Sequence, residues 1–134
     1  MIPIKDLRIG DLVKTTTRNP ILEKGSICKV VLIDALINSI IVQKNDVDVC
    51  RCLVKEEIEG IRLTPDILEK NGWEQEYYAP IIYGHIGHDI EISFLQTSKR
   101  CSVLLNDISL CEIQYVHELQ HILWALGEDA NLKI

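Results

Sequence analysis

Two histidines and a glutamate near the C-terminus have the residue types and spacing of a zinc peptidase site. The segment reads His117-Glu118-Leu119-Gln120-His121, an H-E-x-x-H. On a helix, this spacing places the two imidazoles one turn apart, where both can bind one zinc ion. Glu118 can then act as general base for a metal-bound water. The motif therefore predicts a zinc-dependent peptidase if a third ligand and a cleft accompany it.

The residues after the motif do not supply that third ligand. The short-spaced form of the motif needs Gly at position 124 and His at position 127, where this chain has Trp124 and Gly127. His85 and His88 are the other two histidines, and they stand in a glycine-containing turn that could fold over the last helix. A closed four-histidine metal site is one alternative. We favour the other, in which these are surface histidines and the protein holds no metal or other cofactor.

The helix that carries the motif is predicted from about residue 110 to 126, ending at Gly127. At about 100° per residue, its apolar residues gather in an arc of about 120°. These are Tyr115, Val116, Leu119, Ile122, Leu123 and Leu126. His117 and His121 fall on the opposite, solvated side, with Trp124 beside them and Glu118 at their flank. Trp124 is expected to be covered by residues 84–88 or by another chain.

The elements upstream predict an α+β protein in two parts. Residues 1–63 contain short strands separated by turns, typical of a small barrel or a strongly bent sheet, with residues 61–63 as a short closing strand. The arrangement resembles an SH3-like β-barrel. Residues 64–134 predict an α-β-β-β-α region packed against the barrel. It begins with a short helix at Thr64-Pro65, which ends at Asn71-Gly72. An antiparallel sheet follows, with strands at 74–83 (interrupted at Pro80), 89–95 and 101–105, and then the C-terminal amphipathic helix.

The composition disfavours nucleic-acid binding. The formal net charge is −6, and no basic run exceeds Lys99-Arg100. A nucleic-acid-binding module in the N-terminal barrel is retained as an alternative. It needs one basic face made by Lys14, Arg18, Lys24, Lys29 and Lys44.

The sequence also predicts a soluble, cytoplasmic protein with buried, inert thiols. Residues 1–6 lack the long apolar core of a signal peptide, and no apolar run approaches the roughly 20 residues that span a bilayer. The five cysteines are an odd number, which argues for reduced thiols. In a strand, Cys50 and Cys52 point to the same face.

Three segments in order resemble a known group of proteins. They are Leu7-Arg-Ile-Gly-Asp-Leu-Val13, Ile61-Arg-Leu-Thr-Pro-Asp-Ile-Leu-Glu-Lys-Asn-Gly-Trp73 and Ile113-Gln-Tyr-Val-His-Glu-Leu-Gln-His-Ile-Leu-Trp-Ala-Leu-Gly127. This order is similar to that of small uncharacterised proteins from Bacteroidales genomes and their phages or prophages. Their motifs read L-R-I-G-N, P-L-T-E-E-W-L-L-K-F-G-F and Y-V-H-Q-L-Q-N-L-Y-F-A-L-T-G. This group has no established activity, so the resemblance implies none for this chain. It does imply that Glu118 and His121 depart from the group's pattern.

Together, these observations predict a non-catalytic binding or assembly accessory protein of a phage or mobile element. Its partner is expected to be another protein or a second copy of the chain, with no nucleic acid and no membrane. The predicted contact surface consists of Trp124, His117 and His121 on the last helix, with His85 and His88 in the turn.

Overall fold

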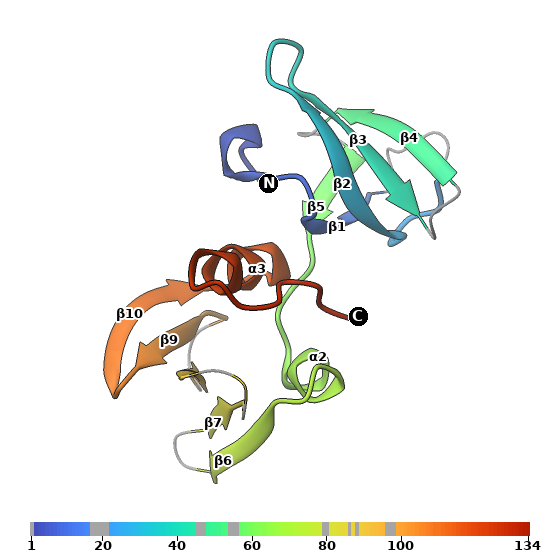
Figure 1. The fold of residues 1–134 in the computed structure, drawn as a ribbon. Coiled ribbons are helices and arrows are strands. Elements are labelled where there is room, and N and C mark those ends of the chain that lie inside the picture. Colours follow the sequence, from blue (N-terminus) through green and yellow to red (C-terminus); the bar gives the residue numbers. More distant parts are fainter. Residues whose placement is uncertain are drawn as a thin grey trace. The chain divides into compact units, whose positions relative to one another are not determined.

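The computed structural model describes residues 2–16, 22–44, 48–53, 57–78, 81–85, 87, 89–95 and 99–134. The chain divides into two compact units, unit 1 (Met1–Ile61) and unit 2 (Arg62–Ile134). Each unit contains one five-stranded antiparallel sheet, and the helices are few and short, so the α+β class is confirmed (Figure 1). No helix among the described residues has both the length and the apolar character needed to cross a bilayer.

Unit 1 is built from a short 3-10 helix and five strands. Their bounds are η1 (Ile4–Asp6), β1 (Leu12–Thr15), β2 (Ile27–Asp34), β3 (Ser39–Lys44), β4 (Asp48–Leu53) and β5 (Ile58–Gly60). A tight turn around Gly10 precedes β1. Gly10 has a φ of +98°, and the Asp11 carboxylate accepts a hydrogen bond from the backbone N–H of Arg8 at 2.7 Å. This turn directs the chain into β1.

The sheet of unit 1 has the strand order β4-β3-β2-β1-β5 and is open. No pairing joins β4 to β5 within the part of unit 1 that the structure describes, so the closed barrel expected from the sequence is not observed. The predicted closing strand at residues 61–63 was also wrong, because the strand that pairs with β1 is β5. Arg62 instead forms an isolated bridge with Tyr115 in unit 2.

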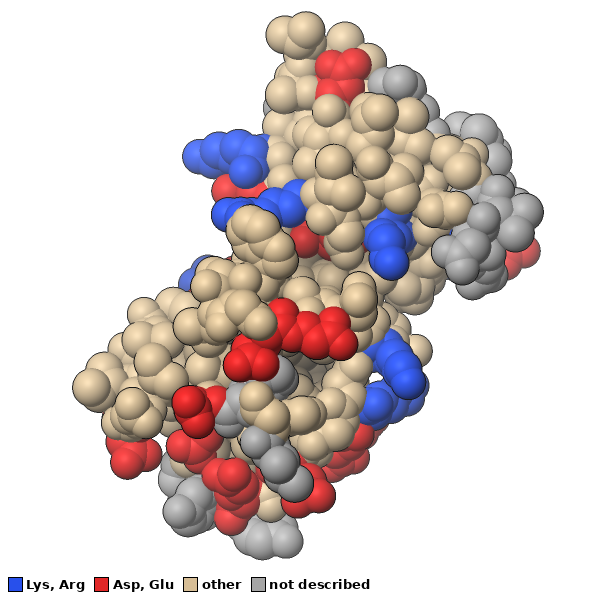
Figure 2. Space-filling model, in the orientation of Figure 1, with Lys and Arg blue, Asp and Glu red and all other residues tan. Residues whose placement is uncertain are grey.

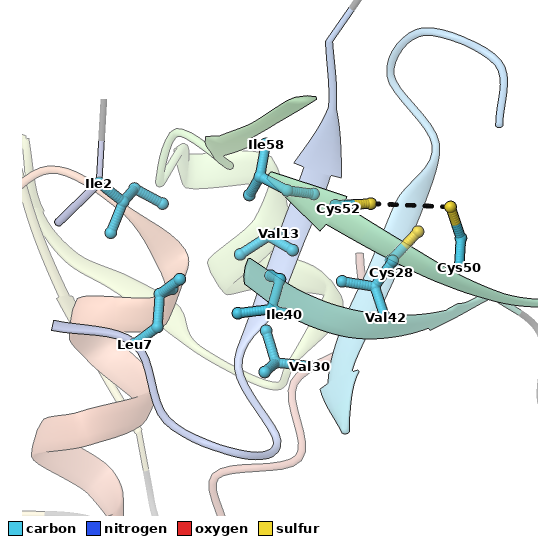
Figure 3. Packing of buried hydrophobic residues seen from close by; sticks show 10 residues of the cluster. All are labelled: Ile2, Leu7, Val13, Cys28, Val30, Ile40, Val42, Cys50, Cys52 and Ile58. Atoms are coloured by element: carbon cyan, nitrogen blue, oxygen red, sulfur yellow. Dashed lines mark hydrogen bonds between the residues drawn. The ribbon is translucent and has the colours of Figure 1, made fainter. Parts of the chain in front are cut away.

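One face of this sheet buries a single apolar cluster. Its members come from the N-terminal segment and from all five strands: Ile2, Leu7, Val13, Cys28, Val30, Ile40, Val42, Cys50, Cys52 and Ile58 (Figure 3). Val30 and Val42 alternate with more exposed neighbours, as side chains on a pleated strand must. The edge strands β4 and β5 contribute Cys50, Cys52 and Ile58 to this cluster, so all five strands share one core.

Unit 2 contains two helices and a five-stranded meander. The elements are α2 (Pro65–Lys70), β6 (Glu74–Tyr78), β7 (Ile81–Gly84), β8 (Ile90–Phe94), β9 (Cys101–Leu105), β10 (Ile108–Ile113) and α3 (Val116–Ala125). The strand order is β10-β9-β8-β7-β6. The largest fully buried side chains of unit 2 belong to α2, β8, β9 and α3: Leu68, Ile90, Ile92, Val103, Leu119 and Leu123.

The start and stop signals of α2 were read correctly from the sequence. Thr64 is the N-cap, and its hydroxyl accepts a hydrogen bond from the N–H of Ile67 at 3.4 Å. Asn71 is the C-cap, and Gly72 follows with a φ of +84°. The Asn71 amide also exchanges two hydrogen bonds with the backbone of Lys133, at 2.7 and 2.8 Å, and so anchors the C-terminal segment to α2.

Two elements of unit 2 differ from the prediction. The strand expected over residues 74–83 is a hairpin of β6 and β7, and the interruption expected at Pro80 lies outside the described residues. The helix expected from residue 110 begins only at Val116, because the preceding residues form β10. Asn106 and Asp107 have φ values of 50° and 64° and join β9 to β10. Positive φ at both central residues is the signature of a two-residue hairpin turn.

Candidate functional site

The two histidines of the H-E-x-x-H motif lie in different environments. His117 is buried, with 3% of its surface exposed, whereas His121 is half-buried. The ring of His117 stacks on the Tyr115 ring, and the two histidine rings meet edge to face with centroids 5.7 Å apart. The prediction that His117 faces solvent was therefore wrong, and His117 is not part of an exposed contact surface.

Glu118 is held at the start of α3 by the backbone. Its Oε1 atom accepts hydrogen bonds from the N–H groups of Gln114 at 3.1 Å and Tyr115 at 3.0 Å. Tyr115 is the N-cap, so Glu118 occupies the third helical position, from which a glutamate reaches back to the cap. The carboxylate thus satisfies backbone donors that the helix leaves unpaired. A general base needs a carboxylate directed at a metal-bound water, and this one is directed at the backbone.

His85 is occupied by packing in another part of unit 2. Its ring lies 5.5 Å from the Trp73 ring between centroids, and its Nδ1 atom accepts a hydrogen bond from the N–H of Gly87 at 2.9 Å. A Cβ atom at Gly72 would stand 3.0 Å from His85 Nε2, so the ring covers that glycine closely. His88 lies outside the described residues. Among the residues that are described, no three His, Cys, Asp or Glu side chains form a group able to hold a metal ion.

The C-terminal segment explains why the helix wheel misplaced His117. The buried residues of α3 are Val116, His117, Leu119, Gln120 and Leu123. At about 100° per residue, their arc is rotated by roughly 80° from the predicted one, toward His117 and Gln120. Gln120 Nε2 donates a hydrogen bond to the carbonyl of Ala130 at 3.1 Å, so residues after the helix turn back along it. A helical wheel considers one helix alone and cannot include burial by the residues that follow the helix.

The end of α3 carries an exposed aromatic residue. Trp124 is 66% exposed, whereas the other tryptophan, Trp73, is 2% exposed. Leu126 is 46% exposed, and Ala125 between them is also exposed. We call Trp124 and Ala125 the α3-end surface, because Leu126 lies about 200° further round the helix than Trp124 and faces another side. Gly127, with a φ of +75°, ends the helix as predicted, and the N–H of Glu128 donates to the carbonyl of Leu123 at 2.8 Å.

The thiols offer no activated nucleophile. Cys28, Cys50, Cys52 and Cys101 are buried, and burial raises the pKa of Cys101 to about 11. The sulfur atoms of Cys50 and Cys52 lie 3.8 Å apart on one face of β4, as the strand geometry predicted (Figure 3). Cys111 is exposed on β10, and burial together with the Glu118 carboxylate raises its pKa. A raised pKa lowers the fraction of reactive thiolate.

Sequence reasoning missed one acidic pair on the sheet of unit 2. A hydrogen bond that protonated Glu91 donates to the Glu76 carboxylate raises the pKa of the Glu91 carboxyl, and burial and repulsion from Glu76 and Asp107 add to the effect. The Glu76 carboxylate lies over Gly84, because a Cβ atom at that position would overlap it. The two glutamates are far apart in sequence, and only the pairing of β7 with its neighbours brings them together.

Comparison with known proteins adds no functional assignment. Models of known protein families, curated proteins and solved structures gave no match to this chain. Function is therefore inferred from the geometry of the side chains described above.

Proposed function

We propose that this protein is a non-catalytic binding protein that contacts another protein chain through the α3-end surface. The single observation that carries the proposal is the 66% exposure of Trp124. Tryptophan is enriched at the centres of protein interfaces, where its burial contributes much of the binding energy. Half-buried His121 lies one turn before Trp124 on α3 and belongs to the proposed contact.

The geometry of the motif supports a non-catalytic role. A zinc peptidase needs three protein ligands around one open metal position and a carboxylate available to a metal-bound water. Among the described residues no third ligand joins His117 and His121, and Glu118 accepts two backbone hydrogen bonds. We therefore rank the peptidase alternative below binding.

The nucleic-acid alternative has little support from the basic residues of unit 1. Lys14 lies 3.6 Å from the carboxylate of Glu59, and Lys44 donates to the hydroxyl of Ser26 at 3.4 Å. Arg18 lies outside the described residues. Glu59 partly neutralises Lys14, and residues 1–61 carry as many Asp and Glu as Lys and Arg, which disfavours phosphate binding.

The finer features of the fold and the setting are also proposals. We propose that the sheet of unit 1 is SH3-like, which is supported by its strand order and by the shared burial of Cys52 on β4 and Ile58 on β5. The resemblance to proteins of Bacteroidales genomes and their phages or prophages supports an assembly role for a phage or mobile element. We place that role in the cytoplasm, as the sequence led us to expect.

The test compares Trp124→Ala with Leu36→Ala. Leu36 is 98% exposed, between β2 and β3 in unit 1, and controls for the loss of an exposed apolar side chain. We expect Trp124→Ala to keep the wild-type circular dichroism spectrum and to lose self-association in light scattering or capture of a purified partner. We expect Leu36→Ala to retain both. Equal binding by both variants would contradict the proposal, as would stoichiometric zinc in untagged protein that disappears in His121→Ala.

A further inference from the structure

The acidic charge of this protein is concentrated in unit 2. Residues 62–134 contain five Lys and Arg against eleven Asp and Glu, whereas residues 1–61 contain nine of each, so unit 2 carries the whole net charge of −6. Figure 2 shows acidic side chains gathered on the face of unit 2 that is in view. Any partner that approaches unit 2 therefore meets a negative potential.

The excess of acidic over basic residues is most marked in the C-terminal part of unit 2. From Cys101 to Leu132 there is no Lys or Arg, and there are five Asp and Glu. This stretch comprises β9, β10, α3 and most of the segment that follows. The α3-end surface therefore lies in a part of the chain that supplies no cation.

The helix itself adds to this negative potential. Backbone dipoles leave about half a negative charge at a helix C-terminus, where proteins commonly place Lys or Arg. The last turn of α3 contains no basic residue, and Glu128 and Asp129 follow directly after it. Trp124 and Ala125 thus present apolar surface beside a helix end that favours a cation.

We propose that the α3-end surface binds a segment of another protein that carries Lys or Arg beside apolar side chains. A leucine-like side chain of the segment covers Trp124, and its cations face the helix end with Glu128 and Asp129. A guanidinium or ammonium group also stacks favourably on an indole face. Anionic lipid surfaces and nucleic acids carry the wrong charge for this site. This inference rests on the proposed binding role and adds the chemistry of the partner.

Three synthetic peptides of equal length test the proposal: an amphipathic Leu/Lys peptide, the matching Leu/Glu peptide and a Ser/Lys peptide without apolar residues. Binding is measured by fluorescence anisotropy of the labelled peptide. A blue shift of the tryptophan emission that is absent in Trp124→Ala reports contact at Trp124. We expect the Leu/Lys peptide to bind, and Trp124→Ala to weaken that binding at least tenfold, as for a central interface tryptophan.

Salt dependence and charge variants test the electrostatic half of the proposal. We expect the association rate of the Leu/Lys peptide to fall as the salt concentration rises. We expect Glu128→Gln/Asp129→Asn to lower that rate severalfold at low salt. The control Glu74→Gln/Asp89→Asn makes the same change of net charge on β6 and before β8, and we expect a smaller effect. The salt dependence of the wild-type protein remains decisive if the first double variant does not fold.

The outcomes separate the partner chemistry from the binding role. Two outcomes would overturn the proposal of a basic partner and leave the binding role intact. In the first, the protein binds the Leu/Glu peptide more tightly than the Leu/Lys peptide, through Trp124. In the second, the protein only self-associates, and Trp124→Ala abolishes the self-association. Equal binding of the Ser/Lys peptide, or binding only to phosphatidylglycerol vesicles, would overturn the apolar contact with a protein segment. Binding that Trp124→Ala leaves unchanged would overturn both proposals.

Discussion

Replacing Glu118 distinguishes a capping residue from a catalytic one. The carboxylate accepts two backbone hydrogen bonds at the start of α3, so we expect Glu118→Ala to destabilise unit 2. Glu118→Gln keeps an oxygen that can accept both hydrogen bonds and removes only the charge. We therefore expect Glu118→Gln to destabilise much less. In a zinc peptidase, both variants would instead abolish activity and leave the free energy of unfolding almost unchanged.

The magnitudes follow from the contacts. A backbone hydrogen bond contributes about 0.5–1.5 kcal/mol net, and loss of a helix cap typically costs about 1 kcal/mol. Two hydrogen bonds to one half-buried carboxylate give an expected loss of about 2 kcal/mol for Glu118→Ala, slightly offset by the higher helix propensity of alanine. The negative charge near the helix N-terminus contributes about 0.5 kcal/mol, which is the loss expected for Glu118→Gln.

Urea denaturation followed by tryptophan fluorescence measures these losses. Trp73 is 2% exposed within unit 2 and reports on the unfolding of that unit. Glu112→Ala is the matched control, because Glu112 is exposed on β10, and we expect it to change the free energy of unfolding by less than about 0.5 kcal/mol. If Glu118→Ala costs no more than Glu112→Ala, the capping argument is wrong.

Two further predictions concern groups with raised pKa values. In the native protein, we expect only Cys111 to react quickly with a thiol reagent and the other four cysteines to react on unfolding; Glu118→Gln should speed the reaction of Cys111 near pH 8, because loss of the negative charge lowers its pKa. Rapid reaction of a second thiol in the native state would refute the burial argument. The raised pKa of Glu91 means that its protonated form stabilises the fold below about pH 4.5, and this contribution is lost as the pH rises through the folded pKa. We therefore expect Glu91→Gln, whose amide donates to Glu76 at every pH, to raise the urea midpoint at pH 7 and to leave it unchanged at pH 4. A gain as large at pH 4 as at pH 7 would count against this reasoning.

Local signals in the sequence predicted the elements whose ends are set by adjacent residues. Thr64 and Asn71-Gly72 delimit α2, and Gly127 ends α3, because capping depends on side chains within one turn of the helix end. The short strands of unit 1 were also predicted as a class, because their apolar pattern and the turns between them are local. Whether the sheet of unit 1 closes by pairing β4 with β5 depends on contacts between distant strands, and the sequence did not reveal it.

The hairpin turn at Asn106-Asp107 contained a local signal that was not used. Asparagine and aspartate tolerate positive φ better than most residues and mark two-residue hairpins. Reading this pair as a turn moves the start of the last helix from residue 110 to a position after β10. Tyr115 then becomes the N-cap, and Glu118 becomes the third helical residue.

The position of the H-E-x-x-H within its helix decides what these five residues do. In the middle of a helix, the glutamate side chain projects from the helix surface beside the two imidazoles and is available to a bound metal. In this chain the motif starts at the second residue of α3, so Glu118 reaches back to the backbone N–H groups of Gln114 and of the N-cap Tyr115, just before the helix. A glutamate at the third helical position is a common capping residue. Its carboxylate is bound by backbone N–H groups and is not directed at a metal-bound water. In this chain the spacing of the motif alone therefore does not distinguish a zinc site from a helix cap, and the position of the helix start does.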